Sequence, residues 1–127
     1  MIPEFLRYIA AINFKQGEYF VKKNKLIKNI SDYLSSALDN KNETEMLYMN
    51  SEAILRAIQC QHRLLVERAK GIYSFIHLVF QEYLTAKYIV ENNISIREFQ
   101  NGVDLNNENR WINIEYLVKE IKSDILS

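Results

Sequence analysis

The chain has 127 residues, of which 48% are hydrophobic, and its 16 basic and 16 acidic residues give no net charge. This length suits one domain or one domain with an appendage, and the apolar content excludes a disordered chain. The balanced charge gives no general signal for nucleic acid or for an anionic membrane. The single cysteine, Cys60, excludes an internal disulfide framework and fits a reducing compartment. No apolar run reaches the ~20 residues of a membrane span, and the start of the chain has no signal-peptide pattern, so we expect a soluble cytoplasmic protein.

The first predicted helix covers residues 5–13, where apolar side chains recur at helical spacing. Pro3 and Glu4 suit its first turn, because proline tolerates that position and the acid complements the helix dipole. Gly17 ends the helical pattern. Residues 19–21 are then expected to form a short, β-prone or extended link.

Two further helices are predicted in the next part of the chain. The second covers residues 25–38 and is followed by a polar, loop-like segment over residues 39–45. The third covers residues 52–63, with Asn50 or Ser51 as its N-cap. Its inward-facing side chains are expected to be Ala53, Ile54, Ala57, Ile58 and Leu64.

A β-hairpin is predicted over residues 64–68 and 72–75, with Gly71 at a position that needs a positive φ. A long apolar helix over residues 76–91 follows at once, and Asn92-Asn93 then interrupts its apolar pattern. Its apolar side chains cover more than half of its surface, so we expect it to be buried on several sides. The aromatic residues expected in the core are Tyr73, Phe75, Phe80, Tyr83 and Tyr88. Three helices followed by a hairpin is the order of a winged helix, with the third helix in the place of a DNA-recognition helix.

The composition changes after Asn92. Residues 93–109 are rich in asparagine, with a short helix at residues 95–99, and a last helix covers residues 111–126. Its apolar residues at helical spacing are Ile114, Leu117, Val118, Ile121 and Ile125. The apolar face of this last helix has little chain left to cover it, which predicts a missing partner and self-association. We therefore expect a mainly α fold with a small β-hairpin: a winged-helix-like domain over residues 1–92, then a linker and the start of a helical region over residues 93–127.

Several catalytic and metal-binding patterns are absent from the sequence. A P-loop needs G-x-x-x-x-G-K-[ST], and Gly17, Gly71 and Gly102 do not form one. No apolar run ends in the paired acids of a Walker B motif. Cys60, His62 and His77 have no zinc-ligand spacing, and a Cys60–His62 nucleophile pair is disfavoured because residues i and i+2 point apart on a helix. We expect no enzyme activity and no metal.

One stretch resembles a known family. Residues 73–86, YSFIHLVFQEYLTA, are similar to the F-x-H-x-x-x-Q-E-[FY]-x-x-A signature of NACHT-family signal-transduction ATPases. These are STAND-class proteins, related to the NOD-like receptors and to bacterial NACHT defence proteins, and the signature lies at the end of a winged-helix domain that follows the nucleotide-binding domain. Residues 5–10 with Phe14, and then residues 19–20 and 30–34, resemble the opening of that domain. Arg110-Trp111 resembles the start of the helical region after it.

The resemblance implies a role for His77 and Gln81. In the family, the histidine of this motif reaches the phosphates of bound ADP and holds the winged helix against the nucleotide-binding domain. An imidazole N–H is a suitable donor to a phosphate oxygen; the alternative is a histidine satisfied by a local backbone group. Gln81 follows one turn later on the same side of the helix, where it orients the imidazole or bonds a neighbouring backbone group. Glu82 is expected to pair with a basic residue.

The resemblance implies a regulatory segment of an ATP-dependent molecular switch in signalling or antiphage defence. Such a segment docks on the nucleotide-binding domain and takes part in oligomerisation on activation; ADP or ATP belongs to the parent protein, and no cofactor is expected in this chain alone. One alternative is a stand-alone winged-helix DNA-binding protein, and a second is a helical protein-interaction adaptor. The DNA alternative would use polar residues of the third helix, but the balanced charge weakens it; these residues are Arg56, Gln59, Gln61, His62 and Arg63.

Overall fold

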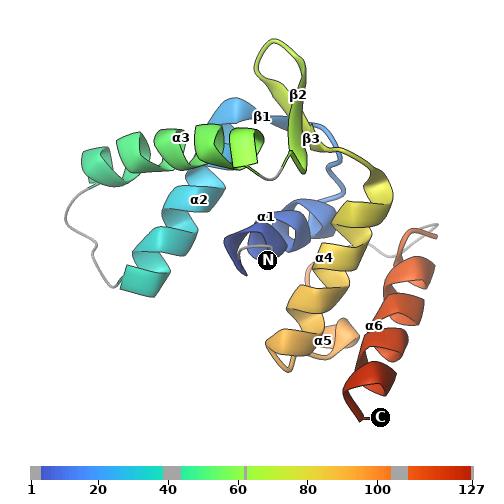
Figure 1. Cartoon of the computed structure of the whole chain (residues 1–127). Helices are drawn as coiled ribbons and strands as arrows, with labels where there is room; N and C mark the ends of the chain where they lie inside the picture. Colours follow the sequence, from blue (N-terminus) through green and yellow to red (C-terminus); the bar gives the residue numbers. More distant parts are fainter. Residues whose placement is uncertain (1–3, 39–43, 62, 104–108, 127) are drawn as a thin grey trace.

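The computed structural model describes residues 4–38, 44–61, 63–103 and 109–126. Six helices and a small antiparallel sheet of three strands are formed in these residues, which confirms the predicted fold class. Figure 1 shows α1 in the middle of the molecule, α2 and α3 on one side of it, and α4 and α6 on the other. The elements are α1 (Glu4–Lys15), β1 (Val21–Lys22), α2 (Lys23–Leu38), α3 (Thr44–Gln61), β2 (Leu65–Ala69), β3 (Ile72–Phe75), α4 (Leu78–Glu91), α5 (Ile96–Phe99) and α6 (Trp111–Leu126).

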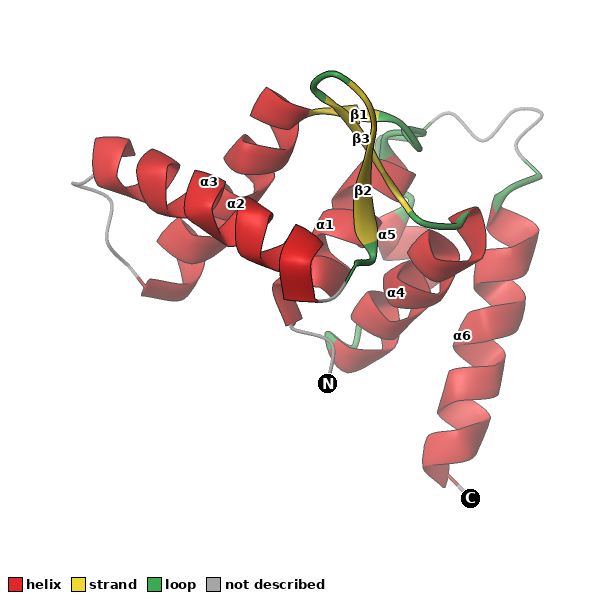
Figure 2. Cartoon of the chain, turned by 45° about the horizontal axis from the view of Figure 1, so that its top comes forward, coloured by secondary structure: helices red, strands yellow, loops and turns green. Residues whose placement is uncertain are grey.

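The sheet has the strand order β1-β3-β2 and lies between α3 and α4 (Figure 2). Strands β2 and β3 form the predicted hairpin, and Gly71 has the expected positive φ of 73°. The sequence predicted an extended link before α2, and the structure adds that β1 pairs with β3, with Val21 opposite Tyr73. A strand of two residues has no recognisable periodicity, so its partner was not predictable from the sequence.

Two helices end at the residues that the sequence indicated. At the end of α1, Gly17 has φ 75° and donates its N–H to the Phe14 carbonyl, while Glu18 donates to the Asn13 carbonyl. These two bonds form a Schellman motif, which satisfies carbonyl groups that have no partner within the helix. At the end of α4, Asn93 adopts the same left-handed conformation with φ 53°. The chain therefore turns sharply at both points.

The start and the inward face of α3 were predicted wrongly. The helix begins at Thr44 rather than Glu52, so Asn50 and Ser51 lie inside it and do not cap it. Ala53 and Ala57 are exposed, whereas Ser51, Leu55 and Ile58 are buried. The buried stripe therefore runs at i, i+4 and i+7 from Ser51. Small alanines carry little apolar area, so their position in a pattern is a weak sign of burial. Of the predicted polar loop, residues 39–43 lie outside the described residues.

The core has two parts that meet at α1 and α4. The first lies between α1, α2, α3, the sheet and α4, and includes Leu6, Ile9, Leu26, Ile30, Leu55, Leu65, Phe75 and Leu84. The second lies between α1, α4, α5 and α6, and includes Ala11, Phe14, Ala86, Ile89, Phe99, Trp111, Ile114 and Val118. None of the helices in the described ranges is long and apolar enough to cross a membrane.

Helix α6 packs against α4, contrary to the prediction that its apolar face lacks a partner. Trp111 is 3% exposed, and its ring lies edge-on to Phe14 at 5.1 Å and to Phe99 at 5.9 Å between centroids. Ile114, Val118 and Ile121 are also buried, as their spacing indicated, but Ile125 is exposed. The sequence could not show that α6 packs against α4.

Arg110 fixes the start of α6 to the end of α1. Its guanidinium donates to the carbonyl of Phe14 and, at 3.3 Å, to the carbonyl of Lys15. The same group lies 4.7 Å from the centroids of the Phe14 and Trp111 rings. A cation suits this place because the C-terminal end of a helix carries a partial negative charge. Arg110 thus caps α1 from a distant part of the sequence.

We expect Trp111→Ala to lower the free energy of unfolding by about 3–5 kcal/mol, because it removes a large buried side chain at the junction of α1, α5 and α6. Urea denaturation followed by circular dichroism measures this change. The matched control is Ile112→Ala, the next residue, whose side chain is 63% exposed. This control should change the free energy by less than about 0.5 kcal/mol. Equal losses in the two variants would show that α6 is not docked in solution.

Candidate functional site

His77 lies at the N-cap of α4 with its side chain exposed to solvent. Its backbone is extended, with φ −141° and ψ 147°, and its side chain makes no capping hydrogen bond to the helix. The imidazole stacks on the Phe80 ring at 6.1 Å between centroids, with 20° between the planes. The imidazole is therefore not satisfied by a capping hydrogen bond, and it is exposed at the N-terminal end of the helix.

The backbone before His77 is held by hydrogen bonds from other elements. The Tyr19 hydroxyl donates to the carbonyl of Phe75 at 3.0 Å. At Ile76, the carbonyl accepts from the Arg68 guanidinium at 2.7 Å, and the N–H donates to the Leu64 carbonyl at 2.7 Å. The backbone of Phe75 and Ile76 is therefore fixed by hydrogen bonds to other segments, and these bonds also fix the position of His77.

Gln81 is almost completely buried, with 1% of its surface exposed. Its side-chain Nε2 donates to the carbonyl of Glu18, 3.1 Å away, in the turn after α1. Of the two predicted contacts, the structure shows the bond to a neighbouring backbone group. Gln81 thus fixes the first turns of α4 against the end of α1.

Glu82 is also buried and lies on the side of α4 that meets α6. Its carboxylate accepts a hydrogen bond of 3.2 Å from Nδ2 of Asn113. The sequence predicted a basic partner, and the hydrogen bond that the structure shows comes from an amide. The adjacent residues Gln81 and Glu82 therefore join α4 to the turn after α1 and to α6.

The first turns of α4 carry an exposed apolar surface around His77. The sequence predicted that this helix is buried on several sides. Its buried side chains all lie between Gln81 and Val90, because α1 and α6 pack against that part of the helix. Phe80 and Tyr83 were predicted to be core residues and are exposed, whereas Tyr73 and Phe75 are buried as predicted and Tyr88 is half-buried. The exposed apolar side chains in these turns are Leu78, Val79, Phe80 and Tyr83.

The polar face of α3 shows a mixture of charges. Glu52 accepts a hydrogen bond from Lys23 at 3.0 Å and lies 3.9 Å from Arg56. The hydrogen bond from Lys23, together with the positive charge of that residue, lowers the pKa of Glu52. The acid thus offsets two of the cations that a DNA-binding face would need. The side chains of Gln61 and His62 lie outside the described residues.

No group of three or more metal-ligating side chains occurs in the part of the chain that the structure describes. The sequence disfavours a nucleophile pair of Cys60 and His62, and the side chains of both residues lie outside that part.

Comparison with characterised proteins and with solved structures found no match to this chain. A family model described as a winged helix-turn-helix domain C-terminal to NACHT matches residues 5–89. The matched range runs from α1 almost to the end of α4 and contains both His77 and Gln81. No NTPase domain was detected in the chain. Since the match covers more than half of the sequence and the structure has the three helices and the hairpin in the expected order, the chain belongs to the family of winged-helix domains that follow NACHT domains.

Proposed function

We propose that this chain is a regulatory docking segment of a NACHT-type, ATP-dependent molecular switch. The observation that carries the proposal is an exposed imidazole at a fixed helix start, His77, within a group of exposed apolar side chains. We call this surface the docking face; it consists of His77 with Leu78, Val79, Phe80 and Tyr83. Its partner is the nucleotide-binding domain of the switch, in the same chain or in another.

The apolar side chains of the docking face suit a protein partner. Val79 is 59% exposed and Leu78 is 49% exposed, although both are large apolar residues. A group of such residues next to one another favours a binding surface over a solvated one. Aromatic residues are enriched in protein interfaces, and the docking face has Phe80 and Tyr83.

His77 supplies the polar contact at the centre of this face. The N-terminal end of α4 carries a partial positive charge, which favours an anion close to it. An imidazole N–H beside this helix end is a donor to a phosphate oxygen. We therefore assign to His77 a contact with the phosphates of ADP held by the partner domain, with Gln81 supporting it by fixing the helix.

This contact would allow the bound nucleotide to control docking. ADP joins the docking face to the nucleotide-binding domain in the resting state, and exchange for ATP releases it and permits oligomerisation. The setting that we propose is cytoplasmic signalling or antiphage defence. The chain itself supplies no catalytic group to nucleotide hydrolysis.

His77→Ala should weaken the binding of this chain to a NACHT nucleotide-binding domain from the same source when that domain holds ADP. We expect a loss of about tenfold, because one hydrogen bond to a charged group is removed. Isothermal titration calorimetry with the ADP-loaded and the nucleotide-free domain measures the change. In the nucleotide-free titration, His77→Ala and the unaltered chain should bind alike.

Two variants separate the apolar part of the docking face from the phosphate contact. Val79→Ser should weaken binding equally with and without ADP, because this side chain does not depend on the nucleotide. Tyr116→Ser, on the exposed side of α6, should change neither titration. If ADP leaves the affinity of the unaltered chain unchanged, the proposed role of His77 is wrong.

Gln81→Met should lower the free energy of unfolding by about 1–3 kcal/mol, because it removes the donor to the Glu18 carbonyl at a buried position. Urea denaturation measures the loss, and Gln59→Met, at a half-buried position of α3, serves as the control. We expect this control to stay within about 0.5 kcal/mol of the unaltered chain. A Gln81→Met chain as stable as the control would show that the hydrogen bond does not fix α4.

A further inference from the structure

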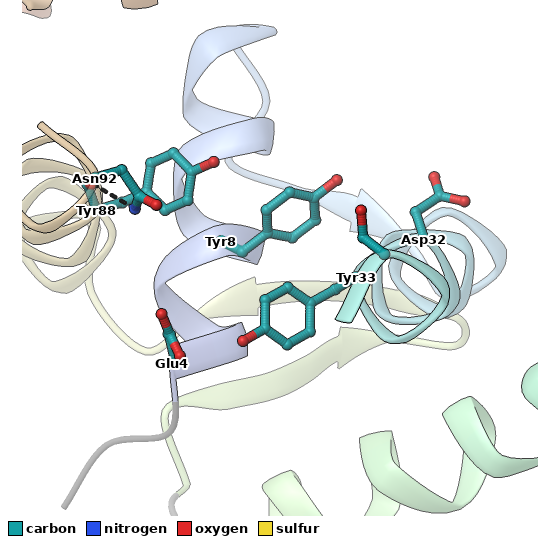
Figure 3. A pocket seen from close by; sticks show the side chains of 7 residues that line it. Glu4, Tyr8, Asp32, Tyr33, Tyr88 and Asn92 are labelled. Atoms are coloured by element: carbon teal, nitrogen blue, oxygen red, sulfur yellow. Dashed lines mark hydrogen bonds between the residues drawn. The ribbon is translucent and has the colours of Figure 1, made fainter. Parts of the chain in front are cut away.

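A cavity of about 280 Å³ opens between α1, α2 and the end of α4. It lies at the C-terminal end of α4, whereas the docking face lies at the N-terminal end, so the two sites are separate. Its walls carry carboxylates, tyrosine rings and an amide. The lining residues labelled in Figure 3 are Glu4, Tyr8, Asp32, Tyr33, Tyr88 and Asn92.

Three tyrosine rings form one wall of the cavity. Tyr8 lies between the other two, 5.5 Å from Tyr33 and 6.1 Å from Tyr88 between ring centroids. Figure 3 shows the Tyr33 hydroxyl pointing toward Glu4, and the hydroxyls of Tyr8 and Tyr88 on the same side as the Asp32 carboxylate. Burial raises the pKa of all three tyrosines, and the charge of Asp32 raises that of Tyr8 further. The rings therefore stay neutral at ordinary pH and keep their electron-rich faces.

The lining is rich in hydrogen-bond acceptors. Glu4 and Asp32 supply carboxylates, and among the lining residues that the structure describes there is no lysine, arginine or histidine. Tyr88 and Asn92 belong to the C-terminal end of α4, where the helix dipole is negative. The amide nitrogen of Asn92 is already used, since it donates to the Tyr88 carbonyl at 2.8 Å. All of these groups favour a positive charge in the cavity.

Two cations lie close to the cavity without lining it. Arg7 pairs with Glu91 at 3.1 Å, and Lys28 pairs with Asp32 at 3.4 Å. The Lys28–Asp32 pair joins two exposed side chains one helical turn apart, and such pairs are weak. A cation that enters the cavity can therefore take the place of Lys28 beside Asp32 at little cost.

We propose that this cavity binds an organic cation, either a guanidinium or a protonated alkylamine. The tyrosine faces attract the cation, its N–H groups donate to the Asp32 carboxylate, and the charge of Glu4 adds to the attraction. The cavity is slightly smaller than the ~300–1,000 Å³ of drug-sized sites, so it suits a head group on an alkyl chain. A free amine and the side chain of an arginine or lysine share this chemistry. The inference does not depend on the role of His77.

The test uses the whole chain labelled with ¹⁵N and titrated with n-butylguanidinium, with n-butylurea as a neutral molecule of the same shape. We expect saturable changes in amide chemical shifts near Tyr8, Asp32 and Tyr88 with the cation, and none with the urea. Asp32→Asn combined with Glu4→Gln should weaken binding about tenfold, because both charges that face the ligand are lost. Glu115→Gln, an exposed acid on α6, should leave the affinity unchanged.

A second ligand distinguishes the two sources of the cation. If N-acetylarginine methylamide binds as well as n-butylguanidinium, the cavity accepts an arginine side chain of a partner. If only n-butylguanidinium binds, the cavity selects a free amine or guanidine. Equal binding of n-butylurea and n-butylguanidinium, or no saturation by either, would overturn the proposal. His77→Ala should leave the binding of n-butylguanidinium unchanged, whereas it should abolish the effect of ADP on binding to the nucleotide-binding domain. The two proposals can therefore fail separately.

Discussion

The packing of α1 against α4 is the contact on which the rest of the structure depends. Helix α1 is buried on two faces: Leu6, Ile9 and Ala10 belong to the core part shared with α2 and α3, while Ala11 and Phe14 belong to the part shared with α6. Helix α4 divides in the same way, since Leu84 lies in the first part and Ile89 in the second. Each part of the core is therefore built on the same pair of helices.

This pair also fixes the proposed docking face. The buried half of α4 is held by Gln81 on the side of α1 and by Glu82 on the side of α6. The exposed half starts at His77 and is supported by the hydrogen bonds to the carbonyls of Phe75 and Ile76. A helix that is anchored along one half can present the other half in a constant position, as a docking surface requires.

The sequence was most informative where a local rule determines the structure. Gly17, Gly71 and Asn93 ended or turned their elements because few residues other than glycine and asparagine adopt a positive φ at low cost. The spacing of Ile114, Val118 and Ile121 likewise predicted the buried face of α6. The signature around His77 and Gln81 led to the family that the comparison confirmed.

The contacts between distant segments were not predictable. Nothing local indicates that Val21 pairs with Tyr73, or that the Arg110 guanidinium caps the end of α1. Exposure of Phe80 and Tyr83 was missed for the same reason, since an apolar helix is buried only where other elements reach it.

His77 and Gln81 belong to one sequence motif but lie in different environments in the structure. His77 and Gln81 lie one turn apart on the same helix, yet Gln81 is buried in a bond to Glu18 and His77 is open to solvent. The same helix is joined to α6 through Glu82, and α6 is joined to α1 through Arg110. A movement of the docking face would therefore break these bonds or carry α1, α4 and α6 together. Since three separate contacts would have to break, the second course costs less free energy, and in the proposed switch the winged helix and α6 would move as one unit.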